Sequence, residues 1–243
     1  YTHMQQAMPS SVKLWAGGFA NELRDDAAGI RATLRRIDKS PLGSAAGYGA
    51  PALKLDREAT AKEMGFASVQ VPVTSVQLSR GKAESQLLFE ITLTMQDLGR
   101  LSSDLLLFYT QEFAFVKLPD AFTTGSSIMP QKRNPDVFEL VRGRTATAHG
   151  CLTEALGIFS KLPSGYQRDL QLLKLPLFRG IDICTQTLDI MSAAVTKVTF
   201  DQTAISSKVN AAIHAADRAY ELSMSEGIPF REAYKRIAAK LTP

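Results

Sequence analysis

The sequence predicts an all-α protein, a bundle of long antiparallel helices followed by a small helical domain. Hydrophobic residues make up 45% and charged residues 21% of the 243 residues, as in an ordinary globular chain. Apolar residues recur at steps of three and four, the spacing of one helix face, over stretches of roughly 25 residues. Helices of that length reach nearly 40 Å at about 1.5 Å per residue, and they must bury their apolar faces against one another. Such length also suggests assembly between chains.

The first helix is expected over residues 11–39, where breakers are few, and it stops at Ser40-Pro41 before a glycine-rich turn. A short helix is predicted over 56–65, with Asp56 as its N-cap, because an aspartate can accept hydrogen bonds from the first turn. Residues 69–78 are apolar and β-branched, and we interpret them as a loop.

Three further stretches have the periodicity of long helices. The first covers residues 82–113 and the second 135–161. The third starts at Pro176 and carries the clearest stripe, a heptad seam with alternating steps of four and three. The members of this seam are Leu177, Ile181, Cys184, Leu188, Met191, Val195 and Val198.

The periodicity is interrupted over residues 196–208, and two shorter helical patterns follow at 211–226 and 230–241. We therefore predict two domains. The helix bundle occupies residues 1–199, and a small helical domain, expected to be incomplete, occupies residues 200–243.

Charge and cysteine content narrow the class of protein. Lys and Arg total 28 against 24 for Asp and Glu, a net charge of +4 spread without a basic stripe, so nucleic acid is not an expected partner. No apolar run approaches the roughly 18 residues of a membrane span. Cys151 and Cys184 lie in apolar helical patterns, as core residues do, and provide neither a disulfide framework nor a zinc spacing. We expect a protein of the reducing cytoplasm.

Residues 125–135 read Gly-Ser-Ser-Ile-Met-Pro-Gln-Lys-Arg-Asn-Pro and place a hydroxyl and a cation just before a helix. The glycine and serines let the backbone close over a ligand, and N–H groups near a helix N-terminus favour anions. Asn134 is predicted to cap the helix with its side chain, while Pro135 and Asp136 suit its first turn. The run predicts an anionic substrate, although Gly-Ser-Ser alone would also suit a polar connector.

The whole run resembles the signature loop of the fumarase and aspartase superfamily, Gly-Ser-Ser-x-Met-Pro-x-Lys-x-Asn-Pro, at every fixed position. Residues 118–124, Gln131 and Asp136 are most similar to the argininosuccinate lyases, as is the opening Tyr-Thr-His-Met-Gln-Gln-Ala-Met-Pro. The resemblance covers the whole chain but only about the second half of such a lyase. Because the chain opens at Tyr1 without an initiator methionine or signal peptide, we interpret it as a piece of a longer protein.

The resemblance implies a carbon–nitrogen lyase of arginine biosynthesis, which cleaves argininosuccinate to arginine and fumarate by β-elimination without metal or organic cofactor. Such chemistry needs a base, a group that stabilises the aci-carboxylate, and an acid for the leaving nitrogen. The resemblance assigns the base to Ser126, the stabilising cation to Lys132, and the acid to His3 with Glu139 as its carboxylate partner. It assigns substrate binding to Thr2, Ser127, Asn134, Tyr166, Gln171 and Lys174.

The family further implies a homotetramer whose active sites combine segments of three chains. Because the family's N-terminal domain, with its Ser-Arg-Asn-Asp substrate-binding segment, has no counterpart in this sequence, this chain alone is expected to associate but not to turn over substrate. Two alternatives remain open at this stage. One is a sister lyase that also releases fumarate, of the adenylosuccinate lyase, aspartase or fumarase type. The other is a catalytically silent structural relative, similar to the lens crystallins. Residues 78–82, Leu-Ser-Arg-Gly-Lys, depart from the family by losing its acidic residues, which puts local contacts there in doubt.

Overall fold

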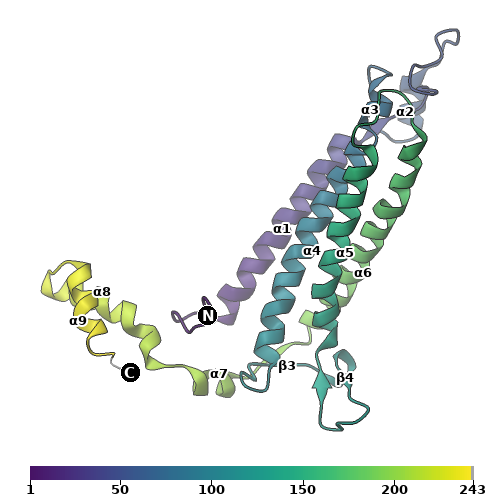
Figure 1. The fold of residues 1–243 in the computed structure, drawn as a ribbon. Coiled ribbons are helices and arrows are strands. Elements are labelled where there is room, and N and C mark those ends of the chain that lie inside the picture. The colour runs from purple at the N-terminus through teal and green to yellow at the C-terminus, as the bar shows by residue number, and fades with distance from the viewer. Residues whose placement is uncertain (242–243) are drawn as a thin grey trace. The chain divides into compact units, whose positions relative to one another are not determined.

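The computed structural model describes residues 1–241 and confirms the all-α class (Figure 1). Its four long helices are α1 (Val12–Ile37), α4 (Lys82–Tyr109), α5 (Asp136–Phe159) and α6 (Lys174–Val195). Figure 1 shows them side by side with alternating chain direction, so the predicted antiparallel bundle is present.

Short elements connect the long helices. The short helices are α2 (Arg57–Glu63), α3 (Ser75–Ser79), α7 (Gln202–Lys208), α8 (Ala215–Glu226), α9 (Phe230–Ala238) and the 3₁₀ turns η1 (Asp120–Phe122), η2 (Arg168–Leu173) and η3 (Ala211–His214). The strands are β1 (Lys39–Ser40), β2 (Ser68–Val69), β3 (Val116–Lys117), β4 (Thr124–Gly125), β5 (Arg133–Asn134) and β6 (Thr199–Phe200). They form three two-stranded ladders, β1 with β2 in parallel and β3 with β6 and β4 with β5 antiparallel.

The structure corrects one local prediction and confirms another. Asp56 is the N-cap of α2 as predicted, since its Oδ1 accepts a hydrogen bond of 2.9 Å from the amide of Ala59. The loop predicted over 69–78 is wrong, because this region contains the end of β2 and the helix α3. Strand β2 pairs with Lys39–Ser40, far away in the chain, and no local pattern carries that information.

The described chain forms two compact units. One consists of Phe19–Leu107 and Leu118–Val198 and contains most of the long helices. The other consists of Tyr1–Gly18, Phe108–Lys117 and the residues from Thr199 on. We call the first the bundle unit and the second the small unit. The division of the chain at residue 199 stays a prediction about its domains.

One cluster of small and apolar side chains in the core lies between α4, α5, α6 and η2. Its buried members are Leu88, Cys151, Ala155, Leu170 and Leu173. Both cysteines of the chain are buried free thiols, as their apolar settings predicted. A Cβ atom on Gly180 would lie only 2.4 Å from Cδ2 of Leu88, so the glycine lets α6 approach α4 closely.

The heptad seam predicted on α6 is wrong in part. Cys184 and Met191 are buried, but Leu188 is 41% exposed and Val195 is 40% exposed. The buried face consists instead of Pro176, Gly180, Cys184, Thr187, Met191 and Ala194. Small residues allow closer helix packing than the large ones counted in the pattern, and the larger side chains are left on the surface.

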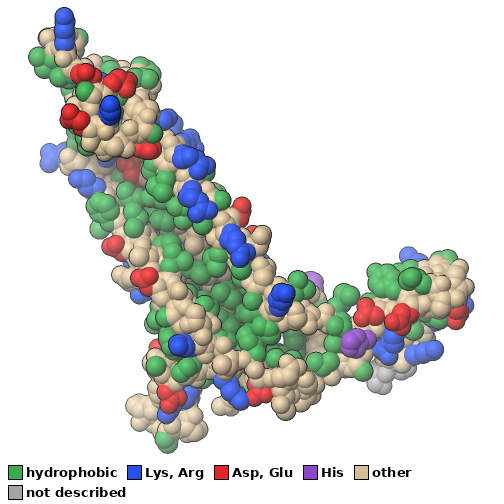
Figure 2. Space-filling model, turned by 180° about the vertical axis from the view of Figure 1, so that it is seen from behind, with side chains coloured by type: hydrophobic (Ala, Val, Ile, Leu, Met, Phe, Trp, Pro, Cys, Tyr) green, Lys and Arg blue, Asp and Glu red, His purple; other side chains and the backbone are tan. Residues whose placement is uncertain are grey.

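Hydrophobic side chains consequently remain visible on the surface of the bundle unit, as a band along the helices (Figure 2). Exposed apolar residues occur on each of the three later helices, with Phe89 and Leu93 on α4, Leu140 and Leu156 on α5, and Phe178, Leu188 and Ile190 on α6. No helix among residues 1–241 combines the length and apolar character required to cross a membrane.

Candidate active site

The signature loop is the tip of a β-hairpin at the N-terminal end of α5. Strand β4 pairs with β5 in the register Thr124 to Asn134 and Gly125 to Arg133. The side-chain cap predicted for Asn134 is wrong, because the N-cap position belongs to Pro135 and no side chain bonds there. The pairing holds Asn134 in an extended strand, so the helix begins only at Asp136 and the hairpin aims the loop.

The hydroxyl oxygen of Ser126 receives two backbone hydrogen bonds from its own loop. The amide of Ile128 donates to Oγ over 3.3 Å, and the amide of Met129 donates over 3.0 Å. Donors aimed at an oxygen favour its charged form, so this arrangement would stabilise an alkoxide at Ser126. The loop tip is open, since Ile128 is 86% exposed. Ser126 is half-buried, and Ser127 beside it is exposed.

The two cations of the loop serve different purposes. Arg133 is tied to the hairpin, with Nε 3.7 Å from Oδ1 of Asp120 and Nη1 donating to the carbonyl of Pro130 over 3.4 Å. Lys132 donates its backbone amide to the carbonyl of Met129, which closes the turn. Its side chain is exposed, and within the described residues its ammonium has no ion-pair partner. Lys132 is therefore the cation available to a ligand.

Glu139 lies on the first turn of α5, and its side chain is exposed. Together with Asp136 it gives the helix N-terminus two acidic residues, the arrangement that the helix dipole favours. Ser126, Ser127, Lys132, Asn134 and Glu139 are thus carried by one hairpin and the helix that follows it.

The second group of predicted residues lies where α5 ends and α6 begins. Nε2 of Gln171, on η2, donates to the hydroxyl of Tyr166 over 2.8 Å, so the structure brings these two side chains together. Lys174 is the first residue of α6 and is exposed. The tyrosine is 42% exposed, which leaves its ring accessible to a ligand.

Two residues outside the predicted site hold this segment in place. The backbone amide of Tyr166 donates to the carbonyl of Ala46 over 3.2 Å. Nη2 of Arg80 donates to the carbonyl of Leu170 over 3.0 Å, and its Nε pairs with Glu84. Arg80 lies in the segment 78–82 that departs from the family, and its contact with Leu170 spans 90 residues, which no local pattern predicts.

A cavity of about 820 Å³ at the α2 and α3 end of the bundle unit has a basic lining. Four of its side chains are cations, namely Arg36, Lys39, Arg80 and Lys82. Because Arg80 also bonds to η2, this basic cavity adjoins the segment of Gln171. An anionic ligand suits such surroundings.

One copy of the chain does not join these two groups. The hairpin precedes α5, and Tyr166, Gln171 and Lys174 follow it. Helix α5 has 24 residues, which corresponds to roughly 36 Å. The groups therefore lie at opposite ends of the bundle unit, as Figure 1 shows for β4 and for α2 and α3.

Thr2 and His3 belong to the small unit, where they form a tight turn. The amide and carbonyl of Thr2 each bond to Gln5 over 2.9 Å. Both residues inside the turn have left-handed backbones, His3 with φ 50° and Met4 with φ 60°. Non-glycine residues are seldom found in this region, and such strain is concentrated at functional sites. The side chain of His3 is exposed on this turn.

Among residues 1–241, no group of three or more His, Cys, Asp or Glu side chains is arranged to hold a metal ion.

Comparisons with known proteins indicate the same family as the signature loop. A family model described as Lyase matches residues 1–150. The argininosuccinate lyase of Sorangium cellulosum is 47% identical over 241 residues, covering 99% of this chain and 55% of that protein. The argininosuccinate lyase of Thermotoga neapolitana is 42% identical over 240 residues, covering 99% of this chain and 60% of that protein. The chain spans little more than half the length of these relatives.

Solved structures support the fold. An EDDS lyase in complex with formate has a TM-score of 0.89 at 24% identity, over 98% of this chain and 47% of that one. The class II fumarase of Schistosoma mansoni has a TM-score of 0.78 at 18% identity, over 98% of this chain and 57% of that one. The resemblance seen in the sequence is confirmed, and since the family model matches more than half of its residues, the chain belongs to the lyase family.

Proposed function

We propose that the protein containing this chain cleaves argininosuccinate to arginine and fumarate, a step of arginine biosynthesis. The identity with argininosuccinate lyases supports the substrate. The observation that carries the chemistry is the environment of Ser126, whose Oγ accepts two backbone hydrogen bonds in the loop that also presents Lys132.

In the proposed reaction, the alkoxide of Ser126 removes the proton from the carbon beside a substrate carboxylate. The electron pair of that C–H bond moves into the carboxylate, and Lys132 stabilises the resulting aci-carboxylate. The pair then forms the carbon–carbon double bond of fumarate as the C–N bond breaks. His3 as imidazolium gives its proton to the departing nitrogen, and Glu139 supports its charged form. Ser127, Asn134, Thr2, Tyr166, Gln171 and Lys174 bind the substrate.

A homotetramer with shared sites is part of the proposal. The hairpin residues and the residues around Gln171 are separated by the length of α5, so a substrate as small as argininosuccinate does not reach both groups on one copy. If copies associate with their bundles antiparallel, the hairpin of one copy meets the Gln171 segment of another. The exposed apolar side chains of α4, α5 and α6 supply a surface for such association.

The test is fumarate release, followed by absorbance, with the complete protein and its Ser126→Ala and Lys132→Ala variants. We expect each variant to lose at least about 10²-fold in kcat/KM, because each removes a group that acts on developing charge. Ser160→Ala and Lys62→Ala are matched controls, since both residues are exposed and lie away from the hairpin. Values of kcat/KM within threefold of the parent for the first pair would refute the assigned roles.

A substrate panel separates the proposal from its rivals. Adenylosuccinate, aspartate and malate would each release fumarate from a sister lyase, whereas argininosuccinate alone is expected to react. A protein that turns over none of the four would instead be a silent structural relative.

A further inference from the structure

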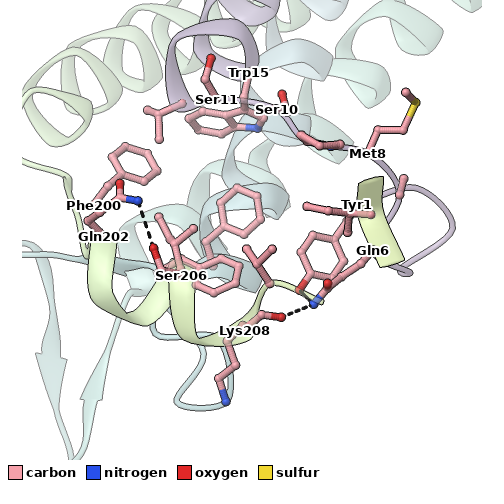
Figure 3. Close-up of a pocket in the computed structure, with 18 residues that line it drawn as sticks. Tyr1, Gln6, Met8, Ser10, Ser11, Trp15, Phe200, Gln202, Ser206 and Lys208 are labelled. Atoms are coloured by element: carbon pink, nitrogen blue, oxygen red, sulfur yellow. Dashed lines mark hydrogen bonds between the residues drawn. The ribbon is translucent and has the colours of Figure 1, made fainter. Parts of the chain in front are cut away.

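The turn that carries His3 is joined to a distant segment of the small unit by the side chain of Gln6. Its Nε2 donates to the carbonyl of Lys208 over 2.5 Å, and its Oε1 accepts from the amide of Asn210 over 2.9 Å. The side-chain amide of Gln6 thus bonds to the backbone on both sides of residue 209, with one donor and one acceptor, as a residue of a paired β-strand does. Figure 3 shows Gln6 reaching Lys208 at the edge of a cavity of about 390 Å³.

The turn needs such support because its backbone is strained. His3 and Met4 both have left-handed backbones, with φ 50° and 60°, where the Cβ atom of a non-glycine residue lies too close to the carbonyl oxygen that follows it. Strained conformations persist only where the surroundings enforce them. The turn itself supplies two backbone hydrogen bonds, between Thr2 and Gln5, and His3 and Met4 are exposed.

Anchors lie on both sides of the turn. Before it, the ring of Tyr1 packs edge-on against Phe113, with centroids 5.3 Å apart, and lies 6.4 Å from Phe115. After it, Gln6 is fixed to Lys208 and Asn210 and also donates to the hydroxyl of Tyr1 over 3.3 Å. Gln6 therefore links the two anchors and determines where the turn lies on the small unit.

We infer that Gln6 is a positioning residue, which holds His3 in its productive place by tying the turn to residues 208–210. The inference rests on the proposed function, since it presumes that His3 is the acid of the elimination. Gln6 does not touch the reacting atoms; it acts through the turn. Small displacements of a catalytic group lower the rate strongly, and about 1 Å can cost 10²-fold.

The first experiment is Gln6→Ala in the complete protein, with fumarate release as the readout. We expect kcat to fall on the order of tenfold to hundredfold while KM changes by no more than about threefold, because Thr2 is the one proposed binding residue on this turn and the others lie on the bundle unit. Gln202→Ala is the matched control. Its amide donates to Ser206 Oγ over 3.2 Å on the wall of the same cavity but does not touch the turn, so its kcat should stay at the parent value (Figure 3).

A double-mutant cycle separates positioning from general support of the fold. If Gln6 acts through His3, then adding Gln6→Ala to His3→Ala leaves kcat unchanged, because the group to be positioned is already gone. A role confined to stability would lower the rate by the same factor in both backgrounds and would overturn the inference. Gln6→Glu keeps the acceptor for Asn210 but loses the donor for Lys208, so its kcat should lie between those of the parent and of Gln6→Ala. This variant also replaces Gln6→Ala in the cycle if Gln6→Ala does not fold.

Amide hydrogen exchange gives a readout that does not depend on activity. In Gln6→Ala the amide of Asn210 should exchange about tenfold faster, whereas Gln202→Ala should leave it unchanged. Unchanged exchange at Asn210 in Gln6→Ala overturns the inference.

Failure of the proposed function and failure of the positioning role give different results. A parent that releases no fumarate overturns the proposed function and with it the role of His3. An active parent whose Gln6→Ala variant keeps the parent kcat overturns only the positioning role.

Discussion

Asp26, a residue of α1, illustrates how single side chains set the pH response of the bundle unit. Its Oδ2 is shielded from solvent and has no hydrogen-bond partner among the described residues. Burial, followed by the nearby carboxylates of Asp97, Asp25, Glu22 and Glu90, raises the pKa of Asp26 from 3.8 to about 6. The folded state therefore disfavours the charged form of this side chain.

Replacing this carboxyl by an amide should stabilise the chain only where the carboxyl is ionised. Because the folded pKa of Asp26 is the higher one, its ionisation reduces stability as pH rises from about 4 through about 6. We expect Asp26→Asn to raise the free energy of unfolding by roughly 1 kcal/mol near pH 8, a value reduced for solvent screening, and to give no gain near pH 4. Denaturant unfolding at both pH values measures this. Asp182→Asn, at an exposed carboxylate of α6, is the control, and an equal gain at both pH values would contradict the explanation.

At the scale of elements, small residues decide how closely the long helices approach. A Cβ atom on Gly180 of α6 would meet Leu88 of α4 at 2.4 Å, and one on Gly99 of α4 would meet Thr145 of α5 at 2.6 Å. The apolar periodicity predicted the helices, but these glycines set the faces by which they pack. Leu188 and Val195, which the periodicity placed in the seam of α6, are 41% and 40% exposed.

A large side chain at this contact should separate the helices. We expect Gly180→Leu to lower the free energy of unfolding by about 1–3 kcal/mol, since overpacking a filled core forces side chains and backbone to shift. Gly150→Leu on α5 is the matched control, because an added Cβ there meets nothing within 4 Å and leucine favours the helix. The packing argument would be disproved if the denaturant midpoints of Gly180→Leu and Gly150→Leu shifted from the parent value by the same amount.

Considering the complete chain, the candidate site residues of the bundle unit are divided between its two ends. Ser126 and Lys132 lie at one end of α5, and Tyr166 and Gln171 lie beyond the other. His3 belongs to a different compact unit. The proposed tetramer is the arrangement that would bring such parts to one substrate, and the exposed apolar residues of the long helices are its proposed contact surface.

Because the chain spans little more than half the length of the argininosuccinate lyases it resembles, we expect it to associate without catalysing the reaction by itself. We expect sedimentation to give a mass near four times the 26.5 kDa of one chain, and no fumarate release from residues 1–243 alone. Leu188→Lys should shift the mass toward one chain, because it places a charge on the apolar face of α6. Leu53→Lys, at an exposed leucine outside the long helices, should not. A parent chain that sediments as a single copy would rule out this surface.

Local patterns were sufficient for much of the fold and for the chemistry of the loop. Helices α1, α4, α5 and α6 follow from apolar periodicity, because each helix closes its hydrogen bonds within its own segment. The cap at Asp56 likewise depends on residues three positions apart. The signature at 125–135 predicted the family, since its hydroxyl, cation and glycine are contiguous.

The helix content, the loop with its Ser126 and Lys132, and membership of the family could thus be read from local patterns of residues. Three contacts became visible only in the folded chain: Asn134 pairs in a hairpin instead of capping α5, Arg80 supports Leu170, and Gln6 binds Lys208 and Asn210. Each of these contacts joins groups whose separation along the chain exceeds one helical turn. Their formation depends on where packing brings the two partners, and that information is spread over every residue that lies between them.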